Sequence, residues 1–128
     1  MSKTILAIPS QMPGGMDSGM GMHFGHCDIY TIVELEDGQV AGQSTLAPIE
    51  HQQGGCMAPV NHLAQNGVNV LLAGGMGLRP LMGFNQVGIS VYQAGGADAV
   101  GQAVQAYLQG GLRPFTPEFT CGGGQAGL

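Results

Sequence analysis

Positive charge is scarce in this chain of 128 residues, which has three Lys and Arg residues against eight Asp and Glu. The formal net charge is −5, and Lys3, Arg79 and Arg113 form no basic stripe that could neutralise a run of phosphates. Nucleic acid is therefore not an expected partner. An anionic ligand must be held by local dipoles and a few donors against the overall negative field.

Long apolar runs are also missing. The N-terminus has one cation and then a four-residue apolar run, which is too short for a signal peptide or a membrane span. We therefore expect a cytoplasmic protein with no membrane partner. The cysteines, Cys27, Cys56 and Cys121, are odd in number, which makes a closed disulfide framework improbable and favours free thiols or metal ligands.

The hydrophobic share of 44% is sufficient for one globular domain, and its periodicity indicates an α/β fold. Expected strands cover residues 4–8, 28–35, 39–46, 68–73 and 88–92, and expected helices follow residue 57 and cover 78–86 and 97–109. These elements predict a mixed sheet of about five strands, parallel except for one hairpin strand, with helices packed on it. We expect a single domain over residues 1–113 with a mobile loop at 10–22, and a flexible C-terminal tail at 114–128.

The order of several short motifs is more specific than any one of them. The motifs are His23-Phe24-Gly25, His51-Gln52-Gln53-Gly54-Gly55, Ala73-Gly74-Gly75-Met76-Gly77, Gly88-Ile89-Ser90-Val91-Tyr92 and Gly110-Gly111-Leu112. Over residues 3–113 the chain resembles the dinitrogenase iron-molybdenum cofactor-binding family. The resemblance implies a ribonuclease H-like α/β fold and binding of iron- and/or molybdenum-sulfide clusters. Nuclease activity is not expected, because the strand at 4–8 has no carboxylate to hold a metal.

The segment from His23 to Cys27 is the first candidate metal site. His23, His26 and Cys27 place two imidazoles and a thiol within five residues, and both ligand types suit zinc, copper, iron and cluster sulfides. The alternative is structural: Phe24 packs inward, Gly25 makes a turn, and Cys27 is a small buried filler.

Cys56 is a second candidate ligand, because it follows Gly54-Gly55 and opens a helix whose free amides and dipole favour a thiolate. Burial in the core beside Val60 and Leu63 explains the same cysteine equally well.

The glycine segment before residue 78 is a candidate anion site. Backbone amides of Gly75, Met76 and Gly77 would approach an anionic cluster, and Arg79 would add a charged fork. The glycine spacing fits neither nucleotide-binding motif, and tight packing of strand on helix is the structural alternative.

The remaining soft side chains are weaker candidates. His51 either ligates or caps a turn, His62 is expected to face solvent, and Cys121 is a second-line ligand or an incidental thiol in the tail. A last group lies in the loop at 10–22, where four methionines would capture Cu(I) or form a hydrophobic flap: Met12, Met16, Met20 and Met22.

These features lead to a functional hypothesis of a carrier or storage protein for a metal-sulfide cluster, with a cluster donor or acceptor protein as its partner. No arrangement of nucleophile and base, and no pair of carboxylates near the glycines, calls for an enzyme. Two alternatives stay open: a Cu(I) or zinc protein that uses the same side chains, and a metal-free regulatory module.

Overall fold

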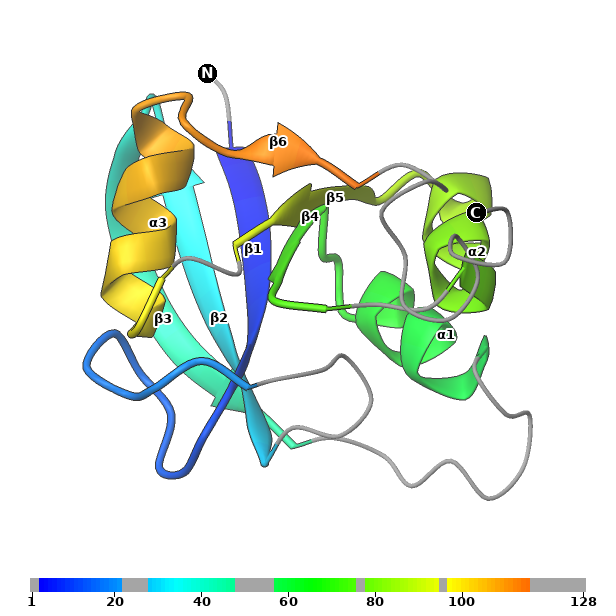
Figure 1. Cartoon of the computed structure of the whole chain (residues 1–128), viewed down its shortest axis with the longest axis horizontal. Helices are drawn as coiled ribbons and strands as arrows, with labels where there is room; N and C mark the ends of the chain where they lie inside the picture. The colour runs from blue at the N-terminus through cyan, green and yellow to red at the C-terminus, as the bar shows by residue number, and fades with distance from the viewer. Residues whose placement is uncertain (1–2, 22–27, 48–56, 76–77, 95–96, 116–128) are drawn as a thin grey trace, which may run out of the picture.

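The computed structural model describes residues 3–21, 28–47, 57–75, 78–94 and 97–115. In these ranges an opening run of strands is followed by alternating helices and strands (Figure 1). No helix in these ranges is long and apolar enough to cross a membrane. The elements are β1 Lys3–Ser10, β2 Ile29–Glu36, β3 Gln39–Leu46, α1 Met57–Gln65, β4 Val70–Ala73, α2 Leu78–Val87, β5 Ser90–Gln93, α3 Val100–Leu108 and β6 Arg113–Pro114.

The strands form one mixed sheet in the order β3-β2-β1-β4-β5-β6. β1, β4 and β5 run parallel, whereas β2 is antiparallel to both β1 and β3, and β6 is antiparallel to β5. The predicted α/β class and mixed sheet are confirmed. The count of five strands was too low, because β6 has only two residues and gives no periodic signal in the sequence.

The first strand is longer than its apolar run. The sequence predicted a strand over residues 4–8, but β1 continues to Ser10, with Pro9 opposite Tyr30 of β2. Pairing with β4 on the other side involves only Leu6 and Ala7. Pro9 therefore lies beyond the parallel ladder, close to the strand end, where a missing N–H is tolerated.

The hairpin of β2 and β3 lies where the sequence predicted it: β3 has the expected bounds, and β2 begins and ends one residue later than expected. Asp37 and Gly38 have φ of 53° and 82°, so both central residues of the two-residue turn are left-handed. One irregularity in the pairing lies between Glu34 and Leu35, where the register of β3 shifts.

Helices cover both faces of the sheet, with α1 and α2 on one side and α3 on the other (Figure 1). Successive side chains of β1 point to opposite faces of the sheet and pack in both core layers, as expected for a strand buried on two faces. Ala7 belongs to the core cluster that contains Leu63 and Phe84, whereas Leu6 and Ile8 pack in a second cluster with α3. The result is a three-layer α/β/α arrangement.

The chain continues on the sheet past residue 113, after which a flexible tail was expected. Pro114 is part of β6, and Phe115 is 9% exposed and packs in the cluster under α1 and α2. The Phe115 amide donates to the Val91 carbonyl at 2.9 Å. The chain therefore stays on the sheet through residue 115, and the rest of the expected tail, 116–128, lies outside the described residues.

Candidate functional site at the carboxyl edge of the sheet

Four strands end at one edge of the sheet. β1, β4 and β5 are parallel and end at Ser10, Ala73 and Gln93, and β3 runs in the same direction because it pairs antiparallel with β2. Leu46, the last residue of β3, pairs with Tyr30 of β2, and the neighbouring β2 residue, Ile29, pairs with Ser10. Open α/β sheets bind ligands outside the carboxyl ends of their strands, so this edge is the candidate site.

All candidate segments but the C-terminal one leave the sheet from these strand ends. Residues 22–27 lie between β1 and β2, residues 47–56 follow β3, and Gly74 to Gly77 follow β4. Parallel topology thus directs three segments, far apart in sequence, to a common edge. Of the predicted residues, those that lie outside the described part of the chain are His23, His26, Cys27, His51, Gly54, Gly55, Cys56, Met76, Gly77 and Cys121.

The described part of the glycine segment agrees with its predicted position. Gly75 is buried two residues after β4, and Arg79 is the second residue of α2, of which the structure describes the backbone only. A cation in the first helical turn is close to the amides that an anion would use. Among the described residues, no group of three or more His, Cys, Asp or Glu side chains could hold a metal ion.

The residues that flank 22–27 are both bonded to the end of β1. The Gly21 amide donates to the Pro9 carbonyl at 2.7 Å, and the Asp28 amide donates to the Ser10 carbonyl at 3.1 Å. Gly21 and Asp28, the two described residues that flank this segment, are therefore held at consecutive residues of β1.

The N-terminus of α3 also lies at this edge, but its first amides already have partners. Val100 donates to the Ser18 carbonyl at 2.9 Å and Gly101 to the Met16 carbonyl at 2.8 Å. Both acceptors belong to residues 11–21, which we call the methionine loop. These bonds use the donors of α3 that would otherwise attract an anion, so the N-terminus of α3 is not an expected anion site.

The methionine loop, expected from sequence to be mobile, is bonded both to the chain around the N-terminus of α3 and to β2. Met20 donates to the Asp98 carbonyl at 3.3 Å, and the Gly15 amide donates to Thr31 Oγ1 at 3.0 Å. Met16 and Met20 are partly buried against the α3 core cluster, whereas Met12 is 64% exposed. Two of the methionines thus anchor the loop, and Met22 lies outside the described residues.

A buried chain of hydroxyl groups supports this anchoring. Ser10 Oγ lies 2.6 Å from the Ile8 carbonyl, which only accepts, and Thr31 Oγ1 lies 2.8 Å from Ser10 Oγ. Ser10 must give its one hydroxyl proton to the Ile8 carbonyl, so Thr31 donates to Ser10 Oγ. The Gly15 amide in turn donates to Thr31 Oγ1, and the chain runs from Gly15 through Thr31 and Ser10 to Ile8. Sequence reasoning missed this network, since neither hydroxyl residue stands in a recognisable motif.

His62 has a partner that the sequence did not indicate. It was expected to face solvent, but it is half-buried, and its Nε2 lies 2.9 Å from the Ala47 carbonyl. This contact fixes α1 against the residue that follows β3. It therefore helps to position one end of the segment that contains His51 and Cys56.

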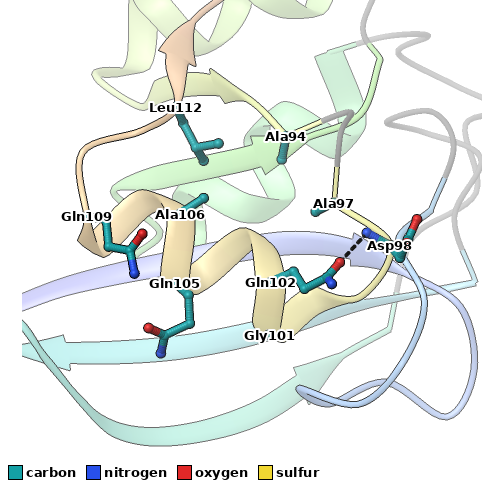
Figure 2. Close-up of a pocket in the computed structure, with 9 residues that line it drawn as sticks. All are labelled: Ala94, Ala97, Asp98, Gly101, Gln102, Gln105, Ala106, Gln109 and Leu112. Atoms are coloured by element: carbon teal, nitrogen blue, oxygen red, sulfur yellow. Dashed lines mark hydrogen bonds between the residues drawn. The ribbon is translucent and has the colours of Figure 1, made fainter.

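A groove of about 610 Å³ lies between α3 and residues outside the helix, among them Ala94, Ala97 and Leu112 (Figure 2). Methyl groups and glutamine amides line it, with the Asp98 carboxylate at one end, and it has no thiol or imidazole. Nothing in its lining resembles a metal-ligand set. Its residues are Ala94, Ala97, Asp98, Gly101, Gln102, Gln105, Ala106, Gln109 and Leu112.

Comparison with known proteins gives consistent matches. Residues 4–110 match the family model described as dinitrogenase iron-molybdenum cofactor. An uncharacterized protein of Methanocaldococcus jannaschii is 30% identical over 97 residues, which cover 73% of this chain and 80% of that protein. The crystal structure of the protein PH0822 has a TM-score of 0.72 and 26% identity, covering 88% of this chain and 96% of that one. The apo form of the orange protein from Desulfovibrio gigas has a TM-score of 0.74 and 23% identity, covering 88% and 97%. The chain therefore belongs to the dinitrogenase iron-molybdenum cofactor family.

Proposed function

We propose that this protein binds a preformed iron- and/or molybdenum-sulfide cluster at the carboxyl edge of the sheet and carries or stores it. The observation that carries the proposal is topological: the segments with His23, Cys27 and Cys56, and the glycines after β4, all leave the sheet at this edge. Family membership supports a role in cofactor binding or trafficking. A solved neighbour, the orange protein, is named as an apo form, which is consistent with ligand binding by this fold.

Charge decides how an anionic cluster would be held. The chain has a net charge of −5, and Asp17, Asp28 and Asp98 are exposed carboxylates on the segments at this edge. They oppose an anion at long range, so binding depends on thiolate and imidazole ligands together with backbone amides. In our proposal Arg79 offsets part of the cluster charge. Such a balance favours transfer over permanent retention, as a carrier to an acceptor protein requires.

In this proposal the protein breaks no bond in its cargo and belongs to the ribonuclease H-like class without being a nuclease. The mixed sheet with helices on both faces supports that class. The described part of β1 has no carboxylate, whereas two-metal nucleases hold their metals with clustered acids.

Anaerobic reconstitution tests the proposal. The purified protein is incubated with a preformed iron-sulfide or iron-molybdenum-sulfide cluster, desalted, and measured by elemental analysis and visible absorption. We expect iron or molybdenum together with sulfide to stay with the protein. Copper or zinc alone in the protein as isolated, or a colourless metal-free protein after reconstitution, would contradict the proposal.

Variants then test the ligands. Cys27→Ala and Cys56→Ala should each lower cluster retention by about tenfold, on the scale of losing one strong interaction of about 1.4 kcal/mol. Met82→Ala is the matched control, because it removes a sulfur that is 52% exposed on α2, outside the edge. If both cysteine variants retained as much cluster as the wild type, the assignment of Cys27 and Cys56 as ligands would be wrong.

A further inference from the structure

The two edges of the sheet differ in how they are protected against an additional strand. β6 forms one edge and consists of Arg113 and Pro114, both exposed. A very short strand, a charged side chain and a proline are features with which proteins block pairing at an edge. β3 forms the other edge (Figure 1), and its residues Gln39–Leu46 include no charged residue and no proline. The β3 edge therefore lacks the protection that the β6 edge has.

The inner strands determine the direction of the backbone groups in β2. In an antiparallel ladder, alternate residues direct their N–H and C=O groups to the same neighbouring strand. Ile5 of β1 pairs with Glu34, but its amide and carbonyl bond on the other side, to Asn69 Oδ1 at 2.8 Å and to the Asn69 amide at 2.9 Å. Glu34 therefore directs its backbone groups away from β1 and toward β3. By alternation, Ile32 does the same.

The same alternation identifies the outward-facing residues of β3. Ser44 pairs with Ile32, so its N–H and C=O groups point inward, toward β2. Gln43 and Thr45, on either side of Ser44, direct theirs to the open edge. No described residue pairs with β3 on this side. The pairing with β2 is regular over residues 42–46, so this stretch of the edge is available to a partner strand.

The side chains of this stretch leave its backbone accessible. Gln43, Ser44 and Thr45 are all exposed. Strand side chains stand roughly perpendicular to the sheet, whereas the outward N–H and C=O groups lie close to its plane. The Gln43 side chain is held on the α3 face, where its Oε1 accepts from the Met16 amide at 3.3 Å. An incoming strand would thus meet polar backbone groups flanked by neutral side chains.

Charge favours a second copy of β3 as the partner strand. The chain has a net charge of −5, but residues 39–46 carry none of it, so two copies can meet here without like charges opposite each other. An antiparallel pair centred on Ser44 places Gln43 of each copy opposite Thr45 of the other. Because these residues face outward, each such pair can exchange both of its N–H···O bonds.

We propose that this protein forms a two-fold symmetric dimer in which β3 pairs antiparallel with β3 of a second copy, with Ser44 at the centre. The contact joins the two six-stranded sheets into one continuous sheet. An interface one strand wide is small, so the dimer is weak. Since both copies are acidic, salt that screens their long-range repulsion should strengthen it. This inference does not depend on cluster binding.

Sedimentation equilibrium and amide hydrogen exchange test the dimer over protein concentrations from about 10 μM to about 1 mM. We expect the average mass to rise toward that of a dimer. Exchange at the Gln43 and Thr45 amides should slow as the concentration rises, whereas exchange at Ser44, whose amide faces β2, should change little. A wild-type protein that stays monomeric over this range overturns the proposal and leaves the edge to an extended segment of a different protein.

Charged substitutions at Ser44 locate the interface. Ser44→Lys and Ser44→Glu each place like charges opposite each other across the two-fold axis, so each variant alone should dimerise at least about fivefold more weakly than the wild type. A mixture of the two places a cation opposite an anion, and its heterodimer should be at least about fivefold tighter than either homodimer. Ser44→Thr stays neutral and should keep the wild-type dissociation constant.

Met82→Lys and Met82→Glu are the matched controls for net charge. Met82 is 52% exposed on α2, which lies near the β5 end of the sheet (Figure 1), far from β3. These variants change the net charge by the same amounts and should weaken the dimer clearly less than the Ser44 variants do. Dimerisation that survives both charged Ser44 variants, or that the Met82 variants weaken equally, overturns the assignment to β3. If a Ser44 variant does not fold, the exchange pattern of the wild type still decides.

Discussion

The Thr31 hydroxyl takes part in two hydrogen bonds in the interior of the protein. It is fully buried, accepts from the Gly15 amide and donates to Ser10 Oγ. Thr31→Val keeps the shape but leaves the Gly15 amide without this acceptor and Ser10 without this donor. We expect a loss of about 1–3 kcal/mol in the free energy of unfolding, the cost of unsatisfied buried polar groups. Urea denaturation measures it.

Thr31→Ser is the control for that prediction, because it keeps the hydroxyl and removes only a methyl group. It should lose clearly less stability than Thr31→Val. Equal losses in the two variants would show that packing of the methyl group, and not the hydrogen-bond chain, is what position 31 provides.

Tyr107 gives a prediction about pH. Burial raises the pKa of the Tyr107 hydroxyl above its ordinary value of 10.0, and the neighbouring Tyr92, whose ring centroid lies 5.4 Å away, raises it further. The folded state therefore holds the phenolic proton more tightly than the unfolded state. This contribution to stability is complete below pH 10 and is lost as pH rises through the folded pKa.

Urea denaturation between about pH 8 and 11, a window that brackets the usual tyrosine pKa, tests this prediction. Wild-type stability should fall across the upper part of the window, and Tyr107→Phe should show a smaller fall. An identical pH dependence in the two proteins would contradict the assigned direction.

At the scale of elements, a substitution in the β2–β3 turn measures the cost of a left-handed backbone conformation separately from steric clash. Gly38 has φ of 82° and nothing within 4 Å of an added Cβ, so Gly38→Ala suffers strain without a steric clash. We expect a loss of about 1 kcal/mol. Gly42→Ala, in extended strand with equally open space, should cost less, and chemical denaturation of the pair measures the difference.

Elements with a periodic signal were predicted well from the sequence. The hairpin strand β3 lies where the sequence placed it, after the turn signal at Asp37-Gly38, and helix α2 lies after the glycine segment as expected. The bonds of the methionine loop were not predictable, because Met16 and Ser18 hold α3 through backbone carbonyls, which every residue type has. The sequence of the loop, rich in glycine and without period, gives no sign of these partners.

At the scale of the whole molecule, Phe115 joins the last described residues to the core. Phe115→Ala should lower the free energy of unfolding by about 3–5 kcal/mol, the usual range for removal of a buried phenyl ring. Pro114→Ala is the control, because Pro114 is exposed. If Phe115→Ala lowered the free energy of unfolding by less than about 1 kcal/mol, close to the effect of a surface substitution, Phe115 would lie outside the cooperative core.

The common edge of the site follows from topology, which the order of strands and helices in the sequence already indicates. Gly75 and Arg79 lie where that order placed them. Which of His23, Cys27 and Cys56 bind the cargo depends on side-chain geometry in segments without periodicity. Their roles therefore stay predictions, to be decided by the reconstitution experiments.

The hydroxyl chain that runs from Gly15 to Ile8 has one more consequence. Because each donor in it has only one possible direction, the protons on Thr31 and Ser10 cannot rotate freely, and both side chains are shielded from water. Hydroxyl protons of this kind exchange slowly enough to give their own resonances in NMR spectra. These two resonances should broaden or disappear when the methionine loop dissociates from α3 and β2, so they report on the position of the loop.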